Sequence, residues 1–272
     1  MQEDIVMRKL LIIIMTLILV IGAAACSQAG TEPLGHAGPD DTGLDTSADG
    51  YVTLTARIME IKGASFLTAN MGDDANDADI YWINVGDTEV IGVSGGKLKS
   101  DSLKEGMLVD ILYDGVVMES YPMQVANIKS IRVREEGDDL AGFYMSVIND
   151  LYKTDPGLND GIERIAFDFS GVSNLTETEK MALVYRLGSF YEMEAIRGTH
   201  DELSEQGYID NEKLSFETGI LFIMELSNVK SDRFNFNIRK WRGGDGAYYF
   251  QDCTAKKTNG SWKYTVGSHM IS

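Results

Sequence analysis

Residues 233–241 read RFNFNIRKW, and this stretch decides the fold of the C-terminal half of the chain. Phe234, Phe236 and Ile238 alternate with polar residues, so the apolar side chains fall on one side of an extended segment. A period of two is the pattern of a half-buried β-strand. We therefore predict a strand here with one apolar face and one polar face.

Further β-type runs lie on both sides of this strand, at residues 219–229, 247–257 and 261–267. Asn259-Gly260, between the last two runs, is a typical hairpin turn. The four runs together predict an antiparallel meander.

The residues before the meander show helical spacing. Apolar positions in 140–153 recur at i, i+3, i+4, i+7, i+8 and i+11, which is one helix face, and Asp138 or Asp139 is placed to cap it. A short strand is expected at 164–169. Capping boxes then begin two more helices, at Thr176 with Glu179 and at Thr199 with Glu202.

These elements together predict an α+β domain over residues 138–272. Its helices are expected to pack on a curved antiparallel sheet, because they come first in the chain and the strands follow. We therefore expect the whole chain to be an α+β protein.

A separate β-type pattern occupies residues 51–134. Runs rich in β-branched and aromatic residues lie at 52–61, 80–85, 107–113 and 125–133, with Gly- and Asp-rich turns between them. About five short strands without a long helical pattern predict a small OB-like β-barrel.

The N-terminal segment has the composition of an export signal. Residues 10–21 are apolar, Arg8 and Lys9 precede them, and small residues fill 22–25. The run is shorter than the roughly 20 residues that span a bilayer, so residues 1–25 are predicted to be a cleaved signal peptide. Because Glu3 and Asp4 do not suit such a signal, translation is expected to start at Met7.

Cys26 follows the predicted cleavage site and resembles the lipobox cysteine of bacterial lipoproteins, which carries a thioether-linked diacylglycerol. Ala23 stands where a lipobox usually has Leu, and the small residues also fit ordinary signal peptidase. We expect lipidation, since the ordinary route would leave a reactive thiol exposed. A disulfide with Cys253 is the alternative. Residues 26–50 are rich in Gly, Pro, Ser and Asp, which predicts a flexible linker with an r.m.s. reach of about 25 to 30 Å.

Three resemblances extend this prediction. Residues 103–115 (LKEGMLVDILYDG) and 118–133 are similar to small β-barrel domains of exported proteins from Gram-positive bacteria, which implies a fold and no activity. The element order of residues 138–272 resembles the NTF2-like or cystatin-like class. The whole chain is similar to lipoproteins of Firmicutes-type bacteria, which implies the extracytoplasmic face of the cell membrane.

The formal net charge is −18, so the surface should repel phosphate backbones, which argues against nucleic acid as a partner. The expected partners are the membrane, through the lipid, and an envelope protein, peptide or glycan. A sheet of the NTF2-like class commonly forms a pocket, so we predict a concavity for an anionic or sugar-like ligand. Its candidate residues are Arg233, Arg239, Trp241, Arg242, Tyr248 and Trp262. The alternative is a plain solvent-facing strand surface.

No motif in the sequence predicts catalysis, a metal or a cofactor. Residues 92–96 spell G-x-S-x-G but lack the following helix of a nucleophile elbow, and the three histidines lack zinc-binding spacing. The acidic loop 73–79 fits a solvated turn better than a calcium site. We therefore expect a non-catalytic binding or accessory module. The alternatives are a hydrolase using a pocket carboxylate, Asp168 or Glu225, and a sensor of envelope stress.

Overall fold

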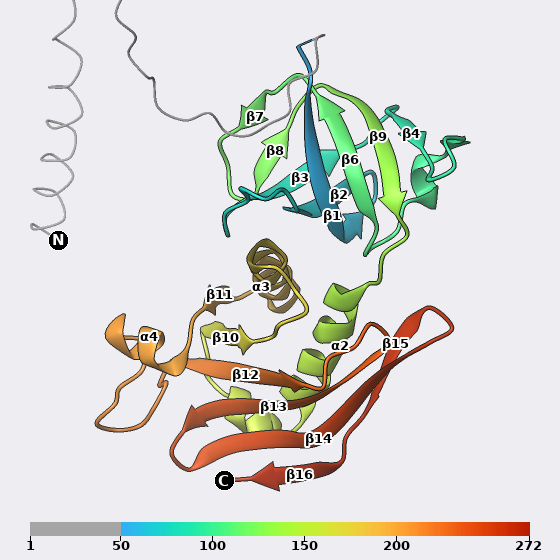
Figure 1. Ribbon diagram of the computed structural model, residues 1–272. Coiled ribbons are helices and arrows are strands. Elements are labelled where there is room, and N and C mark those ends of the chain that lie inside the picture. Colours follow the sequence, from blue (N-terminus) through green and yellow to red (C-terminus); the bar gives the residue numbers. More distant parts are fainter. Residues whose placement is uncertain (1–49) are drawn as a thin grey trace, which may run out of the picture. The chain divides into compact units, whose positions relative to one another are not determined.

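The computed structural model describes residues 50–272. The predicted signal peptide, Cys26 and the linker up to residue 49 lie outside the described residues. Residues 50–272 belong to one compact unit, which has an α+β fold with two sheets (Figure 1). Among the described helices, none has the length and apolar character needed to cross a membrane.

The first sheet is built from residues 52–135 and curls around its own core. β1 pairs antiparallel with β2 and β6, β3 pairs parallel with β8, and β6 pairs antiparallel with β9. Only Ala126 and Asn127 separate β8 from β9, so one nearly continuous segment joins the β3 side of the sheet to the β6 side. The strands are β1 (Val52–Lys62), β2 (Ser65–Asn70), β3 (Ile80–Asn84), β4 (Glu89–Ile91), β5 (Lys97–Leu98), β6 (Leu108–Tyr113), β7 (Val117–Met118), β8 (Met123–Val125) and β9 (Ile128–Glu135), with a 3₁₀ turn, η1 (Ser100–Ser102), after β5.

β2 was not predicted from the sequence, although it lies between β1 and β3. Both of its faces are buried, so its residues do not alternate between apolar and polar. Phe66 packs into the core of the first sheet. Leu67 and Ala69 pack on the opposite face in a second apolar cluster.

The second sheet, expected to be antiparallel, is mixed. β10 pairs parallel with both β11 and β12, and only the strands from β12 onward form an antiparallel series. The prediction missed β11, a four-residue edge strand. The strands are β10 (Arg164–Gly171), β11 (Glu194–Arg197), β12 (Gly219–Ser227), β13 (Arg233–Gly243), β14 (Gly246–Thr258), β15 (Ser261–Thr265) and β16 (Ser268–Ile271).

Helices cover both faces of this sheet. The helical segments are α2 (Leu140–Lys153), η2 (Pro156–Asn159), α3 (Glu177–Tyr191) and α4 (His200–Glu205). α2 and α3 pack on the face that carries Phe167 and Phe236. Leu203 of α4 packs on the other face, with Ala166 and Ile223.

The predicted helix signals are confirmed. Asp139 caps α2 by accepting a hydrogen bond from the Gly142 backbone N–H at 2.7 Å. Both predicted capping boxes are present, at the N-termini of α3 and α4. Five of the six predicted apolar positions of α2 are buried, and the sixth, Leu140, packs partly against the same core.

α3 lies between the two sheets and is buried on two sides (Figure 1). Leu183 and Leu187 pack into the core of the second sheet. Ala182 packs against Leu67 and Ala69 of β2. A helix buried on two sides has no single apolar stripe. The start of α3 could therefore be predicted from its capping box, but its burial between two sheets could not.

Polar side chains of α3 also reach the first sheet. Arg186 donates from Nη1 to the carbonyl oxygen of Met59 at 2.7 Å, and its Nη2 lies 3.2 Å from Oε2 of Glu105. Glu179, which closes the capping box, lies 2.9 Å from the Nε of Arg57 in β1. These partners are largely buried, so water screens the pairs less than it screens surface pairs.

Cys253 in β14 is buried and free. Burial raises the pKa of its thiol to about 11. At neutral pH the group is therefore a protonated, apolar-like core residue.

Lys240 occupies the apolar face of β13, the strand RFNFNIRKW, and is completely buried. Its Nζ donates to the carbonyl oxygens of Tyr152, Thr154 and Asp155 at 3.2, 2.5 and 2.9 Å, and it lies 3.2 Å from Oδ1 of Asn159. The last carbonyls of a helix have no partner within the helix. The ammonium group therefore caps the C-terminal end of α2 and ties it to the sheet.

We predict that Lys240→Met destabilises the protein by about 2–4 kcal/mol, because the carbonyl oxygens at the end of α2 lose their donor while the packing volume is kept. Urea unfolding measures the change. Lys256→Met, on the exposed part of β14, is the matched control and should leave the stability within about 0.5 kcal/mol. Equal stability of the two variants would contradict the capping role.

Candidate functional site

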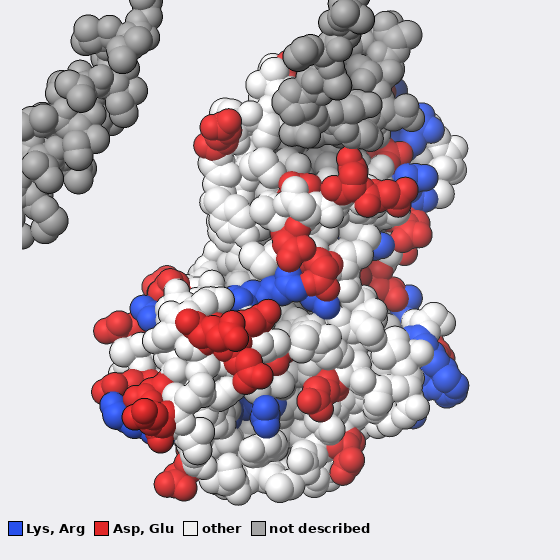
Figure 2. Space-filling view, turned by 60° about the vertical axis from the view of Figure 1, so that its left-hand side comes forward, with Lys and Arg blue, Asp and Glu red and all other residues white. Residues whose placement is uncertain are grey.

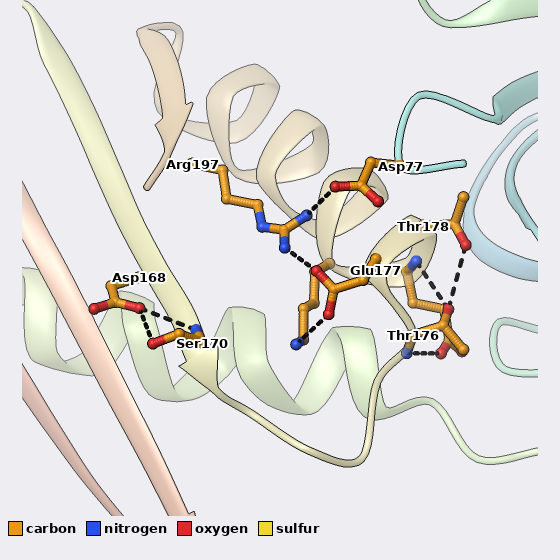
Figure 3. Close-up of polar contacts among 9 residues, drawn as sticks. Asp77, Asp168, Ser170, Thr176, Glu177, Thr178 and Arg197 are labelled. Atoms are coloured by element: carbon orange, nitrogen blue, oxygen red, sulfur yellow. Dashed lines mark hydrogen bonds and ion pairs between the residues drawn. The ribbon is translucent and has the colours of Figure 1, made fainter. Parts of the chain in front are cut away.

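A cavity of about 420 Å³ opens where the parallel strands β10 and β11 end. The carboxyl ends of parallel strands are a common position for ligand sites in open sheets. The lining residues come from β10, α3, β11, α4 and the loop between β2 and β3: Asp77, Asp168, Phe169, Ser170, Met181, Arg197, Gly198, Thr199, Glu202 and Gln206. Figure 3 shows several of them.

Asp168 is the buried carboxylate of this cavity, with 9% of its surface exposed. Its Oδ1 accepts hydrogen bonds from the backbone N–H of Ser170 at 2.9 Å and from the Ser170 hydroxyl at 2.6 Å (Figure 3). The pairing of β10 with β12 becomes irregular between Asp168 and Gly171, which allows this tight turn of the backbone. Within residues 50–272, no cationic side chain forms an ion pair with Asp168.

Arg197, at the end of β11, is held from two sides. Its Nη1 lies 3.1 Å from Oδ2 of Asp77 in the β2–β3 loop, and its Nη2 contacts Glu177 in the first turn of α3 (Figure 3). The guanidinium charge is therefore neutralised by its own neighbours. The same contacts connect the loop of the first sheet to α3.

Lys180 is the second cation near the cavity. It is buried, and its Nζ donates to Oε1 of Glu177 at 2.7 Å. Burial lowers the pKa of Lys180, and the charges of Asp77 and Asp168 oppose this shift. Like Arg197, this cation is already engaged.

The N-terminus of α4 supplies another carboxylate. Oε2 of Glu202 accepts hydrogen bonds from the backbone N–H of Thr199 at 2.8 Å and from its hydroxyl at 3.0 Å. These hydrogen bonds hold the pKa of Glu202 below its ordinary value, with a smaller contribution from the charge of Arg197. Glu202 is therefore ionised at neutral pH.

The cavity thus combines two engaged cations with carboxylates that have no paired cation. Asp168 lies in the wall and the exposed Glu202 at the rim, and neither forms an ion pair among the described residues. Neither histidine nor cysteine is among the lining residues. Acidic side chains also outnumber basic ones on the face shown in Figure 2. This arrangement suits a ligand that brings a positive charge and hydrogen-bond donors.

The six residues predicted to form one ligand surface lie on different faces of the second sheet. Arg233 and Arg239 are exposed on the α4 side of β13, and Trp241 on the same side packs against the ring of His200. The other three residues are engaged elsewhere, as described next. None of the six lines the Asp168 cavity.

Tyr248 and Trp262 lie on the helix-facing side, where they pack against the main core. Tyr248 pairs with Lys240, a residue of the apolar face of β13, so it lies on the opposite side of the sheet from Arg233 and Arg239 and the six residues do not share one surface. Arg242 donates to the carbonyl oxygens of Leu158, Asp160 and Glu217, so its guanidinium joins two loops. A ligand role for these residues stays a prediction.

The two carboxylates proposed for catalysis lie in different environments. Asp168 lies in the cavity, whereas Glu225 on β12 is exposed. In the acidic loop, Asp77 pairs with Arg197, and Asp79 accepts hydrogen bonds from the backbone and side chain of Asn76. Within the described residues, no group of His, Cys, Asp or Glu side chains is arranged to hold a metal ion.

Sequence reasoning missed Ser170, Lys180 and Arg197 as parts of the site. Arg197 ends a strand that was not predicted, and Lys180 is an ordinary-looking helix residue. The only available signal was the capping box of Thr199 and Glu202, which marks where α4 begins at the cavity.

Comparison with known proteins adds no family. No protein-family model matches the chain, and no curated protein sequence matches it. Among solved structures, aspartyl-tRNA synthetase from Entamoeba histolytica is similar with a TM-score of 0.26 and 12% identity, over 81% of this chain and 56% of that one. This chain therefore spans a little over half of that protein, and a likeness at this TM-score carries no inference about fold or function.

We predict that Arg197 and Asp77 are coupled by about 0.5–1 kcal/mol, because their side chains are 22% and 58% exposed and solvent screens part of their attraction. A double-mutant cycle with Arg197→Gln and Asp77→Asn, measured by urea unfolding, gives the coupling. It should shrink at high salt. The control is the pair Arg134→Gln and Asp77→Asn, whose effects on the free energy of unfolding should add. If the effects of Arg197→Gln and Asp77→Asn also add fully, the contact is disproved.

Proposed function

We propose that the protein is a lipid-anchored lipoprotein of the extracytoplasmic face of the cell membrane and acts there as a non-catalytic binding or accessory module. The lipobox-like Cys26 and the signal-like residues 1–25 support the location. An envelope protein, peptide or glycan is the proposed partner, and the net charge of −18 argues against nucleic acid.

We also propose that the first sheet is an OB-like barrel. The antiparallel order β9-β6-β1-β2-β3, with β8 parallel to β3 and nearly continuous with β9, supports this assignment. The second region is proposed to belong to the NTF2-like or cystatin-like class. Its helices followed by a meander support that class, while the parallel pairs of β10 depart from an antiparallel sheet.

The binding role rests on how the charged side chains around the Asp168 cavity are paired. Both cations near the cavity are held by neighbours: Lys180 donates to Glu177, and Arg197 pairs with Asp77 and Glu177. What is left for a ligand is hydrogen bonding and charge pairing with the carboxylates of Asp168 and Glu202, which is the chemistry of recognition.

A hydrolase is the second candidate, and one contact favours it. The Ser170 hydroxyl lies 2.6 Å from Oδ1 of Asp168, which is the distance between a nucleophile and its base. Asp168 is the carboxylate positioned to accept the proton of the Ser170 hydroxyl.

We predict that Cys26→Ala moves the mature protein from the membrane fraction to the soluble extracytoplasmic fraction, because the diacylglycerol supplies the anchoring energy at about 0.8 kcal/mol per buried methylene. Fractionation followed by immunoblotting measures the distribution. Cys253→Ala is the matched control and should stay with the membrane, since this thiol is buried in the fold. Retention of Cys26→Ala in the membrane would refute the anchor.

We predict that a panel of envelope peptides and glycan fragments contains ligands that raise the Tm and are recovered unchanged. A ligand at a hundredfold excess over its Kd adds about 2.7 kcal/mol of stability, or about 5–10 °C in Tm for a chain of this size. Mass spectrometry of the same mixtures detects turnover. Cleaved products that disappear with Ser170→Ala would establish the hydrolase, and a panel with neither stabilisation nor products would refute the binding role.

A further inference from the structure

Asp168 is a carboxylate buried to nine-tenths with no cationic side chain paired to it among the described residues. Its Oδ2 is not among the buried side-chain atoms that lack a hydrogen-bond partner, so this oxygen is reached from the cavity and is open to a ligand. The hydrogen bonds from Ser170 satisfy Oδ1 only. No described residue hydrogen-bonds to Oδ2, and Asp168 faces a cavity open to solvent.

The chemistry of the cavity selects the kind of cation. No group of three or more His, Cys, Asp or Glu side chains in residues 50–272 is arranged to hold a metal ion. An ammonium group needs fewer charged partners and donates three hydrogen bonds. The lining residues Ser170, Thr199 and Gln206 carry acceptor oxygens near Asp168 and Glu202.

The remaining wall suits the chain that would carry such a group. Met181 of α3 is half-buried and lines the cavity, where its flexible thioether side chain offers apolar surface to methylene groups. Arg197 and Lys180 are held by their own carboxylate partners, and neither forms an ion pair with Asp168 among the described residues.

We propose that the Asp168 cavity binds a primary ammonium group at the end of a short methylene chain, of the kind that a lysine-type side chain of a peptide presents. The ammonium pairs with Oδ2 of Asp168, and Glu202 at the rim adds a second negative charge. This inference rests on the proposed binding function and names its ligand class.

The test uses two probes that differ only in the ammonium group, Nα-acetyl-lysine amide and Nα-acetyl-norleucine amide. Isothermal titration calorimetry of the full protein at 150 mM salt measures both. The lysine probe should bind with one site per chain, and the norleucine probe should bind at least tenfold more weakly. Asp168→Asn should weaken the lysine probe at least tenfold, since Asn keeps the acceptor for Ser170 and removes the charge.

Asp201→Asn is the matched control, because Asp201 neighbours Glu202 on α4 but its side chain is 96% exposed. It should bind the lysine probe like the wild type. If Asp168→Asn does not fold, Glu202→Gln replaces it, since the capping box accepts Gln, and a loss of affinity is again expected.

Equal binding of the two probes, no binding of the lysine probe, or an equal loss in Asp201→Asn would overturn the ammonium site. The envelope-fragment panel separates this failure from that of the proposed function. If neutral fragments raise the Tm while the lysine probe does not bind, only the proposed ligand class is refuted. The proposed binding function then still holds.

Discussion

The packing of α3 between the two sheets is the constraint on which the rest of the structure depends. The helix buries Leu183 and Leu187 against one sheet and Ala182 against the other. Its ion pairs, Glu179 with Arg57 and Arg186 with Glu105, are largely buried and cross to the first sheet. Removing one partner of a buried pair typically costs about 3–5 kcal/mol, so these contacts strongly favour one arrangement over looser ones.

The cavity is a consequence of that packing. The first turn of α3 carries Glu177 to Arg197 at the end of β11, while the first sheet brings Asp77 to the same guanidinium. Asp168 lines the same cavity as Arg197 and Asp77 and forms no ion pair among the described residues. These contacts engage the cations near the cavity and leave an acidic site that is open to solvent.

The prediction from sequence was accurate where the signal is local. The caps at Asp139, Thr176 and Thr199 depend on neighbouring residues, and all three are present. It failed for β2 and β11. β2 is buried on both faces and shows no alternation, and β11 is a four-residue strand that exists because β10 lies beside it. Of the two carboxylates named for a pocket, Asp168 lines a cavity and Glu225 is exposed, and the residues around Asp168 come from parts of the chain that are far apart in the sequence.

By itself, the sequence determined the helix caps, the alternating strand 233–241 and the α+β class, because each depends on residues within a few positions of one another. The tertiary structure alone decided which polar residues meet. Lys240 looks like a misplaced charge in an apolar strand until the end of α2 surrounds it with oxygen atoms. Asp168 is likewise one acidic residue among many until folding places it in the wall of a cavity whose other residues are far apart in the sequence.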